Sequence, residues 1–262
     1  EQLKRLGIMA DWDNTYLTMQ YDSEATIVAE LMKFAEAGNL YRGSKPVMWS
    51  PVEETALAEA EVEYMDHRSP TIWVRFPVVS AKDPLLDGAD IVIWTTTPWT
   101  IPGNRGVACH EKFEYVVIEV TETDEDSLAK PGDRLVFASA LLETTAEKAK
   151  ITGYRELGRL KGAAIEGSLC AHPWRGQGYD FDIPVMLAEF VTDDAGTGFV
   201  HIAPGHGADD YILGMRYRLE VPRTVAEDGT YFPEVPLMSD AAILTDDGKD
   251  GNANGTVIRL LI

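Results

Sequence analysis

Cysteine is scarce in this sequence. Only Cys109 and Cys170 occur among 262 residues, and they form no C-x-x-C pair. Two cysteines exclude a disulfide-rich scaffold and a four-cysteine zinc site. A reducing compartment is the default for such a composition, so we expect a cytoplasmic protein.

Long apolar runs and excess positive charge are also missing. The longest apolar stretches, such as residues 90–94, are strand-sized, whereas a membrane helix needs about 20 apolar residues. Lysine and arginine total 23 against 43 aspartates and glutamates, which gives a net charge of −20. That charge argues against general nucleic-acid binding through a basic surface. Candidates for a local basic rim are Arg159, Lys161, Arg175 and Arg216.

Familiar cofactor and nucleophile motifs do not occur. There is no G-x-x-x-x-G-K-[ST] loop, and Gly196 and Gly198 are followed by His201 where a dinucleotide-binding motif needs glycine. The loop from Asp246 imitates a calcium loop but has Val257 in place of the bidentate acid. No G-x-S-x-G serine motif is present. We expect this segment to hold no cofactor and no metal ion.

The residue pattern predicts an α+β fold. One helix is expected between Ser23 as N-cap and Gly38 as stop, and another over 207–218 with Ile212 and Met215 on its apolar side. Many short strands without regular βαβ alternation indicate a closed or curled sheet. A further helix is predicted from Ser139 to residue 150, and strands at 71–79, 91–94, 115–120, 135–138, 154–160, 183–187, 198–203 and 257–261.

A threonine-rich segment follows one predicted strand. It reads Thr95-Thr-Thr-Pro-Trp-Thr100, is preceded by Trp94 and is followed by Asn104. Hydroxyls at a strand end often satisfy local backbone groups. They also offer donors and acceptors beside aromatic faces, a combination suited to a ribose or a base. By spacing alone the structural and the functional interpretation stay equally open.

A second segment joins a strand to a helix. His201 lies on the strand, which ends in Pro204-Gly-His-Gly207, and the helix starts with Asp209 and Asp210. Acids at a helix start complement its dipole, and one of this pair suffices, which leaves the other free for a cation such as a substrate ammonium. His201 and His206 with these acids are also conceivable metal ligands, although their spacing matches no zinc pattern.

Together, the two segments resemble the inserted editing domain, called connective polypeptide one, of the isoleucyl-tRNA synthetase family. Residues 95–104 are similar to the threonine-rich peptide of that family, and residues 196–211 to its second signature. Residues 11–19 and 56–64 are similar to flanking family segments, so the resemblance covers nearly the whole chain. Valyl and leucyl relatives usually carry Thr-Thr-Arg-Pro, so Thr97 favours the isoleucyl branch.

The resemblance implies a β-barrel-like editing domain with flanking helices. Residues 1–50 would form the junction with a catalytic core, and residues 51–262 the editing domain, with a stalk at 51–64 and 256–262 and a barrel core at 65–250. The signatures His-Ile-Gly-His and Lys-Met-Ser-Lys-Ser do not occur. We therefore expect a proofreading insert that does not activate amino acids or bind ATP productively. Its implied partners are the remaining synthetase domains and the 3′ end of tRNA(Ile) carrying valine.

The implied reaction is hydrolysis of valyl-tRNA(Ile), with valyl-adenylate as a second candidate substrate. By resemblance, Asp210 holds the α-ammonium, His201 excludes the larger side chain, and Thr97 orients the ribose or the attacking water. General-base action by His201 is a second interpretation. Two alternatives stay open: an inactive binding or interaction module, and a metal-dependent hydrolase. The other implied substrate-binding residues are Trp94, Thr95, Thr96, Trp99, Thr100 and Asn104.

Overall fold

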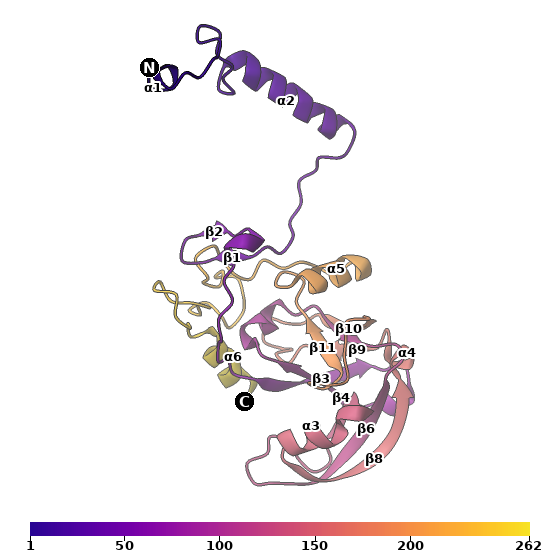
Figure 1. The fold of residues 1–262 in the computed structure, drawn as a ribbon. Coiled ribbons are helices and arrows are strands. Elements are labelled where there is room, and N and C mark those ends of the chain that lie inside the picture. Colours follow the sequence, from indigo (N-terminus) through magenta and orange to yellow (C-terminus); the bar gives the residue numbers. More distant parts are fainter. The chain divides into compact units, whose positions relative to one another are not determined.

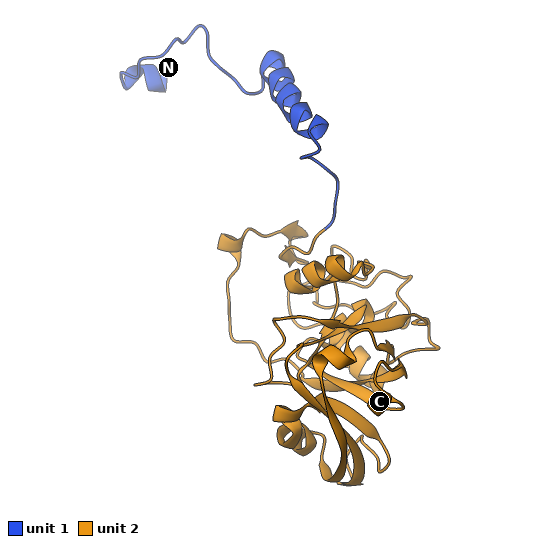
Figure 2. Cartoon of the chain, turned by 90° about the vertical axis from the view of Figure 1, so that its right-hand side faces the viewer, with its two compact units in different colours: residues 1–44 blue, residues 45–262 orange.

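The computed structural model describes residues 1–262 and divides them into two compact units, residues 1–44 and residues 45–262 (Figure 2). Each unit is described by itself. The assignment of residues 1–50 to a junction with a catalytic core stays a prediction.

The first unit contains a short helix, α1 (Gln2–Arg5), and a longer one, α2 (Tyr21–Glu36). The predicted stop of the longer helix is confirmed, because Gly38 has φ +72°, a left-handed conformation that glycine adopts without strain. The predicted cap is wrong: α2 follows Gln20, so Ser23 lies within its first turn. No residue of α2 is buried, and packing therefore contributes little to this helix.

The second unit is built on a mixed nine-stranded sheet, with a separate small ribbon of β1 (Trp49–Ser50) and β2 (Thr55–Ala56) (Figure 1). The strands of the large sheet are β3 (Ile72–Ser80), β4 (Asp90–Thr95), β5 (Gly106–Cys109), β6 (Glu114–Thr123), β7 (Arg134–Ala138), β8 (Ile151–Lys161), β9 (Leu169–Ala171), β10 (Asp182–Leu187) and β11 (Phe199–Ile202). Their spatial order is β11-β5-β10-β9-β3-β4-β7-β6-β8. Only β10–β5 and β4–β7 are parallel pairs.

The sheet curls without closing. Strand β11, at one end of the order, lies against β4 in the interior of the sheet, while the long pair β6–β8 bends through several register shifts. No pairing joins β11 to β8 at the opposite end. The α+β class is thus confirmed, and "barrel-like" describes the curl rather than a closed barrel.

Apolar side chains fill both faces of this sheet. Along β6, Val117 belongs to the large central core, whereas its neighbours Val116 and Ile118 pack in a second cluster that includes Leu142 of α3 (Leu142–Lys148). This alternation follows from the two-residue repeat of a strand. A strand with both faces covered is rigid, which suits it to carry a site.

Helix α5 (Ala208–Tyr217) buries a different face from the one predicted. Its buried residues are Leu213 and Gly214, whereas Ile212 is 65% and Met215 51% exposed. Leu213 packs in a third cluster with Ile202 of β11. A ten-residue helix offers more than one apolar side, and contact with the sheet decides which side is buried.

The C-terminal prediction is also wrong. Residues 257–261, expected as a strand, lie in helix α6 (Ala253–Leu261), where Val257 is fully buried. A short apolar run fits a strand and a buried helix equally well. Ser139 opens a 3-10 turn, and α3 begins after Leu141 without a side-chain cap. The remaining short elements are α4 (Gly162–Ile165) and the 3-10 turns η1 (Glu59–Glu61), η2 (Pro84–Leu86), η3 (Pro98–Gly103) and η4 (Ser139–Leu141).

None of the helices combines the length and the apolar character needed to cross a membrane.

The buried hydroxyl of Tyr115 ties the end of β5 to the start of β11. It donates to the Gly198 carbonyl (2.8 Å) and accepts from the His110 N–H (2.9 Å). We expect Tyr115→Phe to lower the free energy of unfolding by about 1–3 kcal/mol, because two buried backbone groups lose their partner. Urea unfolding measures this loss. Tyr154→Phe, which removes an exposed hydroxyl bonded to Glu143, is the control, and equal stability of both variants would contradict the prediction.

Candidate functional site

Two adjacent strands bring the two sequence motifs together. Strand β4 ends at Thr95 and leads into η3, while β11 carries His201 and leads towards α5. The two strands lie against each other, although they are far apart in the sequence. Pro98 occupies the first turn of η3, where its fixed φ and missing N–H cost nothing. The fold thus brings the threonine-rich turn to the His201 strand.

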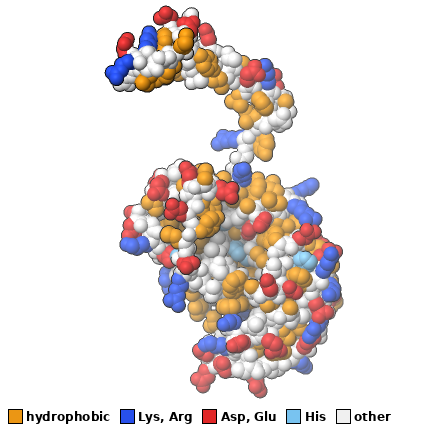
Figure 3. Space-filling view, in the orientation of Figure 1, with side chains coloured by type: hydrophobic (Ala, Val, Ile, Leu, Met, Phe, Trp, Pro, Cys, Tyr) orange, Lys and Arg blue, Asp and Glu red, His pale blue; other side chains and the backbone are white.

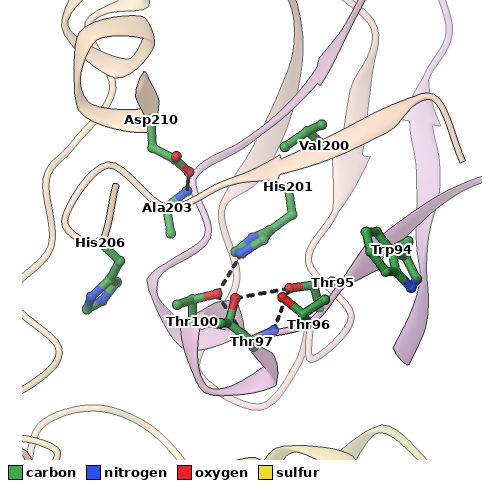
Figure 4. Close-up of a pocket in the computed structure, with 10 residues that line it drawn as sticks. All are labelled: Trp94, Thr95, Thr96, Thr97, Thr100, Val200, His201, Ala203, His206 and Asp210. Atoms are coloured by element: carbon green, nitrogen blue, oxygen red, sulfur yellow. Dashed lines mark hydrogen bonds between the residues drawn. The ribbon is translucent and has the colours of Figure 1, made fainter. Parts of the chain in front are cut away.

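A cavity of about 280 Å³ lies between these elements. It is open to solvent and slightly smaller than the ~300 Å³ at which small-molecule sites usually begin. Figure 4 shows the threonines on one wall and Asp210 on another, with His201 between them. The lining residues are Trp94, Thr95, Thr96, Thr97, Thr100, Val200, His201, Ala203, His206 and Asp210.

Hydrogen bonds within the threonine turn fix its shape. The Thr95 hydroxyl oxygen accepts from the Thr97 N–H (3.1 Å) and lies 3.2 Å from the Thr97 hydroxyl. The Thr100 hydroxyl donates to the Thr97 carbonyl (2.8 Å). Thr96 and Thr97 are exposed at the cavity, whereas Thr95 and Thr100 are buried. The turn therefore presents two hydroxyls to a ligand and uses two for its own structure.

His201 is only 8% exposed, and both of its ring nitrogens are engaged. Since the Thr100 hydroxyl donates to the Thr97 carbonyl, it accepts from His201 Nε2–H (2.7 Å). On the other side of the ring, the Asn104 amide donates to His201 Nδ1 (3.0 Å). Burial lowers the pKa of His201 to about 3, helped by His206 nearby. A neutral ring with no free nitrogen acts as a fixed wall and is a poor general base.

Two predicted substrate contacts lie outside the cavity lining. Asn104 is fully buried and bonds His201 and the Gly106 carbonyl (2.9 Å). The Trp99 ring stands edge-on to the ring of His206, which lines the cavity, with ring centroids 5.0 Å apart. Both residues contact side chains that line the cavity: Asn104 bonds His201, and Trp99 packs against His206.

The Asp210 carboxylate stands at the start of α5, across the cavity from the threonines. One oxygen accepts from the Ala203 N–H (2.8 Å), and the side chain is in none of the salt bridges of the structure. Burial raises the pKa of Asp210, against the lowering effect of the Ala203 bond. Its neighbour Asp209 is exposed and free to serve the helix dipole. An unpaired, partly desolvated carboxylate is a ready partner for a cation.

His206 is a cavity residue that the sequence suggested only as a metal ligand. Its Nε2 bonds the Thr224 hydroxyl (2.7 Å), and burial lowers the pKa of His206 to about 4. A Cβ at Gly103 would lie 2.9 Å from the His206 ring, which explains the glycine there. No three His, Cys, Asp or Glu side chains are grouped so as to hold a metal ion.

Two of the four candidate basic-rim residues are ion-paired, whereas Lys161 donates to the Lys112 carbonyl and Arg216 has no acidic partner. Arg159 bonds Glu156 and Glu114, and Arg175 bonds Asp182. Figure 3 shows lysines and arginines scattered among acidic side chains on this face of the molecule. Arg159 and Arg175 are therefore not free to contact a phosphate unless their acidic partners give way.

Comparison with known proteins assigns the chain to a family. The family model for class I tRNA synthetases (I, L, M and V) matches residues 1–236. The chain belongs to this synthetase family.

Curated relatives similar to the chain are named isoleucine–tRNA ligase. The isoleucine–tRNA ligase of Caulobacter vibrioides is 49% identical over 272 residues, and that of Bradyrhizobium diazoefficiens is 47% identical over 273. Both alignments cover 100% of this chain but only 28% and 27% of the relatives. The chain thus spans little more than a quarter of the length of these relatives.

Solved synthetase structures are more distant. The crystal structure of GlLeuRS-CP1 is 14% identical, with a TM-score of 0.43 over 58% of this chain and 66% of that chain. The editing domain of the P. knowlesi cytosolic leucyl-tRNA synthetase is 13% identical, with a TM-score of 0.41 over 54% and 59%. The family assignment depends on neither of these.

Two buried histidines, His172 and His201, and the half-buried His206 should make this synthetase segment sensitive to mild acid. Burial lowers the pKa of His172 and His206 to about 4 and that of His201 to about 3. Between pH ~6.5 and ~5 the unfolded chain takes up protons that the folded chain refuses. The free energy of unfolding should therefore decrease as the pH is lowered, by up to about 1.4 kcal/mol per pH unit for each histidine.

Urea titrations at pH 7.5, 6.5 and 5.5 measure this slope. His206→Gln should reduce it, whereas His67→Gln, at an exposed position, should leave it unchanged. The carboxyls of Asp90 and Asp210, whose pKa is raised by burial, act in the opposite direction at lower pH, because the folded chain then binds their protons before the unfolded chain does. If the free energy of unfolding depends on pH equally in both variants, His206 does not contribute to the acid sensitivity.

Proposed function

We propose that this segment hydrolyses valine wrongly esterified to tRNA(Ile), as the editing part of an isoleucyl-tRNA synthetase. Relatives named isoleucine–tRNA ligase at 46–50% identity support the isoleucine branch. The observation that carries the proposal is the Asp210 carboxylate, which has no salt bridge and shares a cavity with exposed threonine hydroxyls. An aminoacyl ester has the complementary groups: an ammonium at one end and a ribose at the other.

The need for a second site follows from the similarity of the two amino acids. Isoleucine and valine differ by one methylene, worth only about 1–3 kcal/mol in a binding pocket, a limit for which isoleucyl-tRNA synthetase is itself the established example. One pocket therefore cannot reject valine sufficiently. A hydrolytic site that admits valine and excludes isoleucine removes the remaining error.

In the proposed reaction the chain mainly binds and orients. Asp210 holds the α-ammonium, and the hydroxyls of Thr96 and Thr97 hold the ribose or the attacking water. Water adds to the ester carbonyl, the bond from the carbonyl carbon to the ribose oxygen breaks, and a proton passes to that oxygen. Fixing both ends of the ester aligns its carbonyl for attack. No residue here is required as a strong base, because an aminoacyl ester is already activated.

The acidic charge supports binding of the tRNA body by other domains of the synthetase. A net charge of −20 repels the phosphate backbone, and Arg159 and Arg175 are ion-paired. We therefore propose that this segment recognises only the aminoacylated 3′ end.

Asp210→Ala should abolish hydrolysis of valyl-tRNA(Ile), because the α-ammonium loses its partner. The measurement is deacylation of radiolabelled valyl-tRNA(Ile) by the purified chain at high concentration and by the longer synthetase that contains it. Asp209→Ala is the matched control, since it removes an exposed carboxylate from the same helix turn. Undiminished deacylation by Asp210→Ala would refute the ammonium role. Absence of deacylation by the unsubstituted synthetase would favour an inactive binding module.

His201→Ala should allow hydrolysis of correctly charged isoleucyl-tRNA(Ile), because removing the ring widens the cavity. His201→Gln is the control, since its side chain keeps most of the bulk and its terminal amide carries one acceptor and one donor group. The readout is the ratio of isoleucyl to valyl deacylation rates. If that ratio stays at its original value in both variants, another side chain excludes isoleucine.

A further inference from the structure

The backbone of Trp99 is held by side chains from the C-terminal part of the chain. Its N–H donates to Asn254 Oδ1 (3.0 Å), and its carbonyl accepts from the Tyr231 hydroxyl. Tyr231 is 3% exposed, and Asn254 lies in the first turn of α6. Two remote side chains thus hold the N–H and the carbonyl of a single turn residue.

The position of that residue gives these bonds their importance. Trp99 lies between Thr97, which faces the cavity, and Thr100, which bonds His201. As a residue in the first turn of η3, Trp99 has an N–H without a partner inside the turn. Asn254 supplies the missing acceptor, so the location of α6 determines where the threonine turn can lie.

Packing joins the same elements. Helix α6 is in contact with η3, and Val257 of α6 shares the central core with Ile101 of η3 and with Tyr231. The His172 ring is a third support of η3, because its Nε2–H donates to the Ile101 carbonyl (3.1 Å). The threonine turn is therefore attached to the C-terminal segment, whereas Asp210 is attached to the Ala203 backbone. The threonine wall thus has supports besides the His201–Thr100 bond, which joins it to β11.

We propose that Tyr231 and Asn254 are positioning residues, which hold the threonine wall at the distance from Asp210 that the reaction needs. The proposal rests on the proposed function. Loss of either side chain should leave the ammonium bound at Asp210 and let the nucleoside end of the ester shift. The reacting carbonyl then loses its alignment, so the effect falls on kcat more than on KM.

The test compares Tyr231→Phe, Asn254→Ala and Asn254→Asp in deacylation of valyl-tRNA(Ile). We expect the first two to lower kcat on the order of 10–100-fold with a smaller change in KM. Asn254→Asp should restore most of the rate, because it keeps the acceptor and places a negative charge where the dipole of α6 favours it. The control is Val257→Ala, which weakens packing of the same helix and leaves both Trp99 bonds in place.

Amide hydrogen exchange gives a second readout that needs no substrate. The Trp99 amide should lose protection in Asn254→Ala and keep it in Asn254→Asp. Unchanged protection would disprove the attachment, and unchanged kcat despite lost protection would disprove the positioning role. A fall in kcat for Val257→Ala equal to that for Asn254→Ala would show a general stability effect and overturn the proposal. If the unsubstituted synthetase deacylates nothing, the proposed function fails, while exchange still reports on the attachment.

Discussion

The cavity depends on the hydrogen-bond chain that runs from Asn104 through His201 and Thr100 to the Thr97 carbonyl. It links β11 to the threonine turn, and each donor in it has an acceptor. Because the chain fixes which nitrogen of His201 carries the proton, the ring is rigid as well as neutral. A charged or rotating side chain at this place would give the cavity no defined width.

The curled sheet makes this chain possible. Strands β4 and β11 are brought together although a hundred residues separate their motifs, and the sheet around them is buried on both faces. The site is thus carried by rigid strand ends, while turns and helix starts supply the groups that meet a ligand. Such a division is common where binding groups lie on loops supported by a fixed scaffold.

Much of the fold could be predicted from local patterns, because β3, β4, β6, β7, β10 and β11 are alternating or largely apolar runs; the long β8 has neither pattern, and only its residues 154–160 are predicted. Strands β5 and β9 are not predicted, because β9 has only three residues and β5 (Gly-Val-Ala-Cys) has no alternation of apolar and polar side chains. The strand expected at residues 257–261 is a helix, since burial of Val257 against the core, rather than local preference, decides its conformation.

The site shows the same division. Seven predicted residues line the cavity because their motifs flank strand ends, where functional groups collect. The support of the cavity was not visible in the same way: Tyr231 and Asn254 lie in no recognisable motif, and their importance arises only from contacts across the fold. Asn104 and Trp99 carry family-like signals, yet they lie behind the lining, and sequence spacing does not separate a lining residue from its support.

The lone carboxylate of Asp210 has one more consequence under the proposed function. It binds favourably only an ester whose amino group is free and protonated. An ester with an acylated nitrogen, such as a growing peptide or a formylated residue, brings no positive charge and would leave the carboxylate desolvated without compensation. The same carboxylate that binds a mischarged aminoacyl-tRNA therefore disfavours hydrolysis of peptidyl-tRNA and of formylated aminoacyl-tRNA.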